Sequence, residues 1–501
     1  MVMVKLRLRI VETFGQDYKI IFGCFIVSVL FFGIFAYPNF ATDTYFDATE
    51  TTGEVVKVFL QNGRLFTAAF AAIFKGVLGL GIAWQLRISY SIAIVVTTLS
   101  IYTVYKILCN LVRTTKSISK SASIGILLVA AIIIINPFYI EYYAFYEQGI
   151  MCLGVLLSAL AALSFSHFLT SKSKSYLVLC LTFNALSLLC YQGCYGTFLV
   201  LACFVITSKT DNTKDLLKYV VFSGICYGMP ALIEIIVIKM IGNSRAASHF
   251  DLFDSLQTII SRRNGTFNFH NILIPHFLLI LITLLTFIVT IECTIAKSYH
   301  KLWKFLLRAA FIFAICLLAA LVPILAENTN AINLAPRVVY PFGTVIGLWL
   351  ATTYIICSNR RSILAIIATT VAILIIEWYR FNSIAVGRQQ ANALDRYKVS
   401  QIQNEITSYE TAYNRQIKQI SFVITNSPGD PYPINNLAGI NLSAFRTNWS
   451  DAAIINLYTG RHYKRVKATN EQADHCLQHA KPIFTADQIK FDGDKAIICS
   501  Y

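Results

Sequence analysis

Acidic side chains gather in one short stretch that follows directly on a long apolar segment. Residues 38–50 include Asp43, Asp47 and Glu50, and Glu54 follows in the next turn. The chain as a whole is strongly basic, with a net charge of +16. Carboxylates at a membrane boundary are costly and are usually kept for a function. We therefore expect a catalytic site here, with Asp43 or Asp47 as a general base that activates a hydroxyl group. Glu50 and Glu54 instead fit the exposed face of a surface helix.

Arginines in other loops have the chemistry to bind a phosphate group. Arg64 follows an Asn-Gly turn, Arg337 follows a proline just before a late apolar segment, and Arg262 and Arg263 lie in a long polar loop. A fixed guanidinium neutralises the charge of a departing phosphate. We expect Arg64 and Arg337 to bind the phosphate of a donor, with Arg262 and Arg263 as weaker candidates. The alternative for Arg64 is a side chain that snorkels to the membrane interface.

Two further segments carry acids and amides among aromatic residues. Glu141 and Glu147 lie in a tyrosine-rich loop, and Tyr191 and Gln192 form a corner between two apolar segments. These four residues are candidates for substrate binding, because aromatic faces can stack on a sugar ring. The alternative is an interfacial tyrosine belt and a polar hairpin tip.

The elements that position these residues are membrane spans. The chain has 501 residues, of which 56% are hydrophobic and 14% charged, and its mean hydropathy is +0.60. Such a composition indicates a polytopic membrane protein, in which each helix needs about 20 apolar residues to cross the bilayer. We predict about eleven transmembrane helices, at residues 18–37, 86–108, 122–140, 149–169, 175–191, 193–208, 217–241, 271–296, 305–326, 338–357 and 361–380.

The basic residues set the orientation. Lys and Arg mark alternate loops, all of which fall on the cytoplasmic side when the basic N-terminus is also inside. This pattern orients a membrane protein and does not indicate nucleic-acid binding. It holds only if the apolar stretch 65–84 does not cross the membrane, so we predict surface or dipping helices over 50–84. An ordinary span or a short hairpin is the alternative. All the candidate residues then lie on the outer face.

Two domains are expected. Residues 1–380 form the membrane domain, with the catalytic outer loop at 38–85, and residues 381–501 form a small extracytoplasmic α/β domain. In this tail we predict a helical run over 395–419, a strand at 420–425, a turn at 428–431 and a final strand at 495–499. Cys476 and Cys499 are its only cysteines, and they would pair in an oxidising compartment.

A site on the outer face has no supply of nucleotide-sugars, so a group transfer there needs a donor carried across on a lipid phosphate. The segments Asp43-Thr44-Tyr45, Asn62-Gly63-Arg64, Asn136-Pro137-Phe138 with Glu141, Tyr191-Gln192 and Ala335-Pro336-Arg337-Val338 follow one another in this order. In their order and sidedness they resemble the GT-C superfamily of membrane glycosyltransferases, and more narrowly the phage-type, serotype-converting O-antigen glucosyltransferases.

The resemblance implies a multi-pass protein of the bacterial inner membrane with a GT-C-like all-α fold, N-in and C-out. It implies transfer of glucose, or a related hexose, from a polyprenyl-phosphate-sugar to O-antigen on lipopolysaccharide at the periplasmic face. The transfer inverts the anomeric centre, with Asp43 as the base. The chain has Thr44 where the family pattern has a second acid, which leaves Asp47 as a rival. No cofactor is required, and a divalent metal near Asp43 and Asp47 stays open.

Two other functions remain as alternatives. An O-antigen polymerase or ligase would use a diphosphate-linked donor and basic residues in large late loops, whereas the acids here come early. A lipid or solute transporter without chemistry would place charges midway through its spans and repeat its halves. Here the mid-span charges are at most Glu234 and Lys239, and they lie close to a span end.

Overall fold

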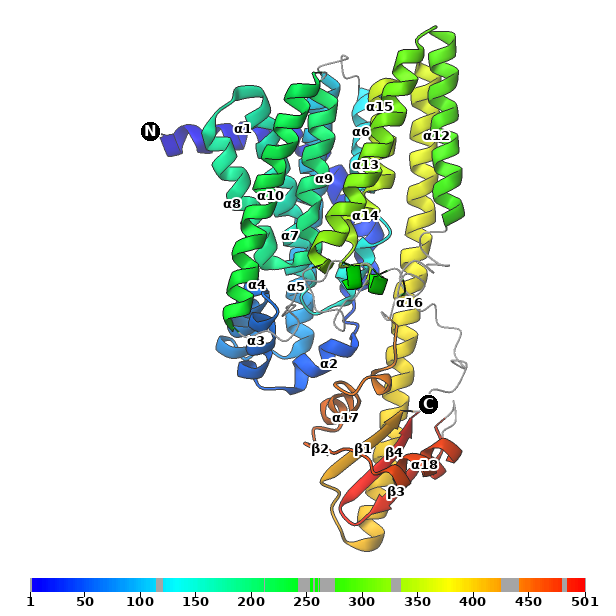
Figure 1. Ribbon diagram of the computed structural model, residues 1–501. Coiled ribbons are helices and arrows are strands. Elements are labelled where there is room, and N and C mark those ends of the chain that lie inside the picture. The colour runs from blue at the N-terminus through cyan, green and yellow to red at the C-terminus, as the bar shows by residue number, and fades with distance from the viewer. Residues whose placement is uncertain are drawn as a thin grey trace.

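A bundle of long helices with a small α/β unit at one end makes up the computed structural model of the chain (Figure 1). The structure describes residues 2–113, 120–210, 212–241, 253–255, 257–259, 261, 275–325, 335–424, 441–479 and 484–500.

The bundle is built from helices that overlap the predicted spans, although several begin or end at different residues. They are α1 (Val2–Phe32), α5 (Ile82–Arg113), α6 (Lys120–Ile134), α7 (Gln148–Ser171), α8 (Lys174–Cys190), α9 (Gln192–Lys209), α10 (Thr213–Ile241), α12 (Pro275–Ile295), α13 (Tyr299–Leu325), α15 (Val345–Ile356) and α16 (Arg360–Tyr413). Among the described residues, six helices are long and apolar enough to cross a membrane, and several other apolar helices are shorter. The chain is thus a helical membrane protein.

The helices differ in how much of their surface the protein itself covers. The apolar windows of α5 and α7 are 72% and 83% buried, whereas those of α1, α10, α13 and α16 are only 28% buried. Uncovered apolar side chains on this scale need a nonpolar environment, which the hydrocarbon core of a membrane provides. The inner helices pack tightly: a Cβ atom on Gly347 of α15 would lie 2.7 Å from the backbone nitrogen of Ile133 on α6.

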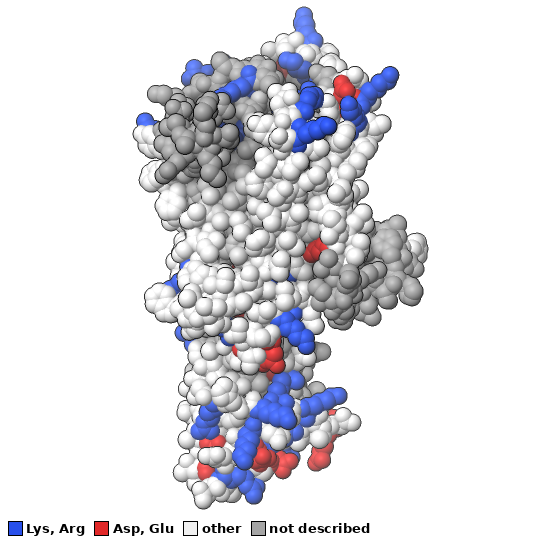
Figure 2. Space-filling view, turned by 90° about the vertical axis from the view of Figure 1, so that its left-hand side faces the viewer, with Lys and Arg blue, Asp and Glu red and all other residues white. Residues whose placement is uncertain are grey.

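Charged side chains are distributed unevenly along the bundle. Figure 2 shows Lys and Arg gathered at the end away from the small sheet, a middle region with few charges, and both signs at the end that carries the sheet. A band with few charges between two charged ends is the surface pattern of a protein that crosses a bilayer.

The predicted outer loop folds as a set of short helices at the sheet-side end of the bundle (Figure 1). The segments are η1 (Gly33–Ala36), α2 (Thr42–Thr49), α3 (Thr52–Gln61), α4 (Leu65–Ala71) and a π-helical turn, η2 (Ala72–Val77). Together α4 and η2 are shorter than the roughly 20 residues needed to cross a bilayer. The stretch 65–84 therefore does not form one uninterrupted crossing helix.

One continuous helix, α16, connects the bundle to the C-terminal unit. Helix α16 runs without a break through residue 380, the predicted end of the last span, and ends at Tyr413, where Asn414 is left-handed with φ 47°. The helical run is thus shorter than the predicted 395–419. The predicted turn at 428–431 lies outside the described residues.

Four strands follow α16, in the order β2-β1-β4-β3. They are β1 (Gln419–Ile424), β2 (Lys464–Arg465), β3 (Ile489–Asp492) and β4 (Lys495–Ser500), with helices α17 (Asp451–Thr459) and α18 (Asn470–His479) between them. Strand β1 runs parallel to β2 and β4, and β3 is antiparallel to β4. The sequence-based strands at 420–425 and 495–499 coincide with β1 and β4.

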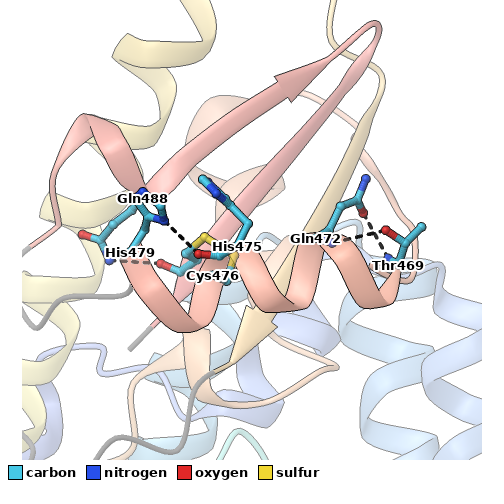
Figure 3. The surroundings of a disulfide bond; sticks show 7 residues. Thr469, Gln472, His475, Cys476, His479 and Gln488 are labelled. Atoms are coloured by element: carbon cyan, nitrogen blue, oxygen red, sulfur yellow. Dashed lines mark hydrogen bonds between the residues drawn. A yellow bond between two sulfur atoms is a disulfide. The ribbon is translucent and has the colours of Figure 1, made fainter.

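A disulfide joins Cys476 of α18 to Cys499 of β4 (Figure 3). This confirms the predicted pair. The bond fastens α18 across a central strand of the sheet, which stabilises a unit too small to have a large core of its own. The other eleven cysteines are free and buried.

Candidate functional site

The predicted site residues come from segments far apart in the sequence and meet at the sheet-side end of the bundle. Asp43 and Asp47 lie on α2, Arg64 begins α4, and Glu141 lies on the 3-10 helix η3 (Tyr139–Ala144). Glu147 caps the start of α7, Tyr191 lies between α8 and α9, Gln192 is the first residue of α9, and Arg337 precedes α14 (Tyr340–Gly343). The ends of the bundle helices and the short helices of the outer loop thus bring these residues to one end of the molecule.

Arg64 and Glu147 form a largely buried ion pair. The guanidinium donates to a carboxylate oxygen at 2.7 Å, and the two side chains are 16% and 5% exposed. The guanidinium also lies over the Tyr191 ring, 4.7 Å from its centroid. Gly63, left-handed with φ 72°, turns the chain so that Arg64 faces inward. Arg64, the candidate phosphate ligand, and Glu147, a candidate substrate ligand, are thus bound to each other.

Arg337 and Glu141 form a second buried pair. The backbone N–H of Arg337 donates to Glu141 at 2.6 Å, and its guanidinium donates to the other carboxylate oxygen. The Glu141 side chain is 1% exposed. The guanidinium also stacks on the Phe145 ring at 4.2 Å. Burial lowers the pKa of Arg337, but the neighbouring acidic groups, of which Glu141 acts most strongly, together outweigh this and the pKa is raised, so the guanidinium stays charged.

Gln192 holds the bundle and the outer loop together. Its amide donates at 2.8 Å both to the backbone carbonyl of Asn62 and to the carboxylate of Glu234 on α10. Asn62 lies two residues before Arg64, so Gln192 helps to position that arginine. Tyr191 packs edge-on against Tyr142 with centroids 5.9 Å apart. These contacts give Gln192 and Tyr191 a positioning role in the structure.

The two aspartates of α2 differ in environment. Asp43 is half-buried and accepts a hydrogen bond at 3.0 Å from the indole N–H of Trp449. Asp47 is buried, and burial, together with the nearby charges of Glu147 and Asp43, raises its pKa well above the ordinary value. Lys75 does not offset this with a direct contact, because it donates to the backbone carbonyl of Asp47. Of the two carboxylates, Asp43 is thus the more accessible to solvent.

Arg388 and Trp449 also interact with Asp43, and neither was predicted from the sequence. Arg388 of α16 is 2% exposed, and its Nε and Nη2 have no hydrogen-bond partner among the described residues. It interacts electrostatically with Tyr45, Asp395 and Asp43. Its spacing of seven residues from Asp395 places both on one helix face, which is a signal the sequence does carry. Trp449 is 406 positions from Asp43, and no local pattern links them.

Some candidates do not join this arrangement. Glu54 is exposed on α3, in keeping with a solvated helix face. Arg262 and Arg263 lie outside the described residues. In the part of the chain that the structure describes, no group of three or more His, Cys, Asp or Glu side chains is arranged to hold a metal ion.

The site thus holds a half-buried carboxylate, Asp43, that interacts electrostatically with the guanidinium groups of Arg337 and Arg388, and Arg64 lies at the same end of the bundle. Such a set can take a proton from a hydroxyl group and stabilise a phosphate anion close by. No protein-family model matches the sequence, and no curated protein matches it either.

Proposed function

We propose that the chain is a membrane glycosyltransferase. It moves glucose, or a related hexose, from a polyprenyl-phosphate-sugar to a glycan acceptor such as the O-antigen of lipopolysaccharide. The observation that carries the proposal is that Asp43 interacts with the guanidinium groups of Arg337 and Arg388, at the end of the bundle that also holds Arg64. A hydroxyl-activating base beside phosphate-binding cations is what transfer from a lipid phosphate requires.

In this proposal the sheet-side end of the bundle faces the periplasm of a bacterial inner membrane. About eleven helices cross, with the N-terminus inside and the C-terminus outside. Two observations support this orientation. Lys and Arg gather at the opposite end of the bundle (Figure 2), which is the pattern of a cytoplasmic face. The Cys476–Cys499 disulfide belongs to an oxidising compartment.

The chemical step is a single displacement. Asp43 takes the proton of the acceptor hydroxyl while the hydroxyl oxygen forms a bond to the anomeric carbon of the donor. The bond from that carbon to the phosphate oxygen breaks, and the lipid phosphate leaves with the electron pair. Attack from the face opposite the leaving group inverts the anomeric centre. Arginine side chains stabilise the charge that develops on the phosphate.

The proposal is tested in proteoliposomes that contain polyprenyl-phosphate-glucose and a lipid-linked O-antigen acceptor. Wild type should transfer glucose, and Asp43→Asn should be slower by about 100-fold or more, the usual contribution of a general base. Glu54→Gln is the matched control, because it removes a nearby exposed acid and should leave transfer unchanged. If Asp43→Asn retains full activity, Asp43 is not the base. If wild type transfers only from a diphosphate-linked donor, the chain is a polymerase or ligase, and transfer from no donor favours a transporter.

A further inference from the structure

Trp449 connects the C-terminal unit to the proposed base. It precedes α17, which packs against α2, the helix that carries Asp43. A second contact between the two helices joins the rings of Tyr45 and Tyr458, with centroids 6.3 Å apart. The indole N–H of Trp449 donates a hydrogen bond to Asp43, and 50% of the residue's surface remains exposed. A large aromatic face is thus left open directly beside the carboxylate.

A cleft of about 400 Å³ opens between residues 37–40, α16 and α17. Its walls are residues 37–40, which lead into α2, three polar side chains of α16 and Tyr458 of α17. The polar residues from α16 are Gln389, Asn392 and Arg396. Asn392 fixes one wall, because its amide bonds both the N–H and the carbonyl of Phe40, at 2.8 and 3.0 Å.

The lining has the chemistry of a carbohydrate site. Sugar rings present C–H faces that pack on aromatic side chains, and hydroxyl groups that pair with amides and guanidinium groups. The cleft offers the exposed rings of Tyr37 and Tyr458, which are 60% and 38% exposed, together with amide and guanidinium donors. Its volume falls within the usual range for ligand pockets.

The candidate ligand-binding residues fall into two groups that differ in charge. Arg64 and Arg337, each paired with a carboxylate at the end of the bundle, suit the phosphate of the donor, and Arg388 adds a buried cation on α16. The cleft and Trp449 belong to the contact between the outer loop and the C-terminal unit, where aromatic and amide groups prevail. An acceptor must reach Asp43 with an uncharged hydroxyl group, and it approaches from the aqueous side.

We propose that the acceptor glycan binds between the first outer loop and the C-terminal unit, with the Trp449 indole as the platform for the sugar that is modified. The cleft of Tyr37, Gln389 and Tyr458 then holds the neighbouring sugars. This inference rests on the proposed function and extends it, because it assigns acceptor selection to the C-terminal unit. The hydrogen bond from Trp449 also holds one oxygen of Asp43, so that the other can face the acceptor.

The test uses the full-length protein in nanodiscs. Initial rates with polyprenyl-phosphate-glucose are measured while the acceptor, a lipid-linked O-antigen repeat, is varied. Trp449→Ala should raise the acceptor KM about tenfold, as expected for loss of one stacked aromatic contact, and should change the donor KM less than about twofold. Trp449→Phe keeps a ring but loses the N–H, so it should lower kcat more than it raises the acceptor KM. The matched control is Tyr413→Ala, which removes a 70% exposed ring at the far end of α16.

Binding without donor provides an independent readout. Purified wild type should bind at least one saccharide on an array of bacterial surface glycans, and Trp449→Ala should lose that signal while Tyr413→Ala keeps it. An unchanged acceptor KM and unchanged array binding in Trp449→Ala would overturn the acceptor site while leaving the transferase intact. Wild-type protein that neither transfers a sugar nor binds any glycan would instead overturn the proposed function itself.

Discussion

The pair of Glu141 and Arg337 provides the sharpest test of how the site is held together. Glu141→Gln keeps the shape of the side chain and removes its charge. In wild type the carboxylate accepts from both the backbone and the guanidinium of Arg337. Glutamine has one acceptor oxygen, so at least one of these donors loses its partner, and the buried cation of Arg337 is no longer neutralised.

The expected loss of stability follows from the burial of the pair. Breaking a buried ion pair from one side costs about 3–5 kcal/mol, because the remaining charge is left uncompensated. Arg337 is 17% exposed and glutamine keeps one acceptor, so we expect a loss near the lower limit, about 3 kcal/mol. The double variant Glu141→Gln/Arg337→Gln removes both charges, and it should recover about 2 kcal/mol relative to the sum of the single variants.

Thermal unfolding can be followed with a thiol-reactive dye, because all eleven free cysteines are buried and react only when the fold opens. The control is Asp17→Asn, which breaks the Lys106–Asp17 pair, whose side chains are 30% and 21% exposed. That change should cost less than about 1 kcal/mol.

Transfer assays separate the two roles that Glu141 can have. If it acts through Arg337, Glu141→Gln raises the KM of the phosphate donor and leaves that of the acceptor unchanged. A melting temperature equal to wild type, or a double variant as unstable as the two singles added together, would refute the reasoning that the pair is the structural anchor of Arg337.

Three further changes test other parts of the site. Because the pKa of Asp47 is raised in the folded protein, it keeps its proton at a pH where the unfolded chain has lost it, so wild-type stability should fall as the pH rises above the ordinary pKa of an aspartate, about 4; Asp47→Asn should flatten this slope in melting curves and leave transfer within a few-fold of wild type. Arg388→Met removes a buried guanidinium whose Nε and Nη2 have no hydrogen-bond partner among the described residues, so it should raise the melting temperature yet lower transfer about 100-fold if the donor phosphate pairs with Arg388; equal activity would exclude that role. Cys476→Ser opens a disulfide loop with a sequence separation of 23 and should cost about 3 kcal/mol in the C-terminal unit, measured by protease resistance; wild-type resistance would contradict this estimate.

The sequence predicted the helices because continuous apolar runs leave few alternatives. It also indicated which residues would meet. Loops at alternate span ends lie on the same side of a bundle, so Asp43, Arg64 and Arg337 were expected together from sidedness alone. The predicted β1 and β4 strands and the Cys476–Cys499 disulfide also followed from local patterns.

The pairing within the site could not be predicted in the same way. Arg64 and Glu147 are 83 positions apart, and Arg337 and Glu141 are 196 apart, so their contact depends on which helices are neighbours. Side-chain packing determines which helices are neighbours, and the hydrophobic periodicity of the sequence does not show this packing. For the same reason the sequence did not indicate that Arg388 lies at the site, because its helix continues past the predicted end of the last span.

The charges of the site explain how arginines that already have ion-pair partners can still stabilise the charge of a phosphate. Arg64 is paired with Glu147 and Arg337 with Glu141, so within each pair the two opposite charges offset each other. A lipid-phosphate-sugar brings one negative charge, and its departing phosphate gains a second. In the proposed step Asp43 loses its own charge at that moment, because it takes the proton of the acceptor. Proton transfer thus offsets the new charge on the phosphate, and Arg388, which interacts with both Asp43 and Asp395, is then attracted less by Asp43 and more by the phosphate.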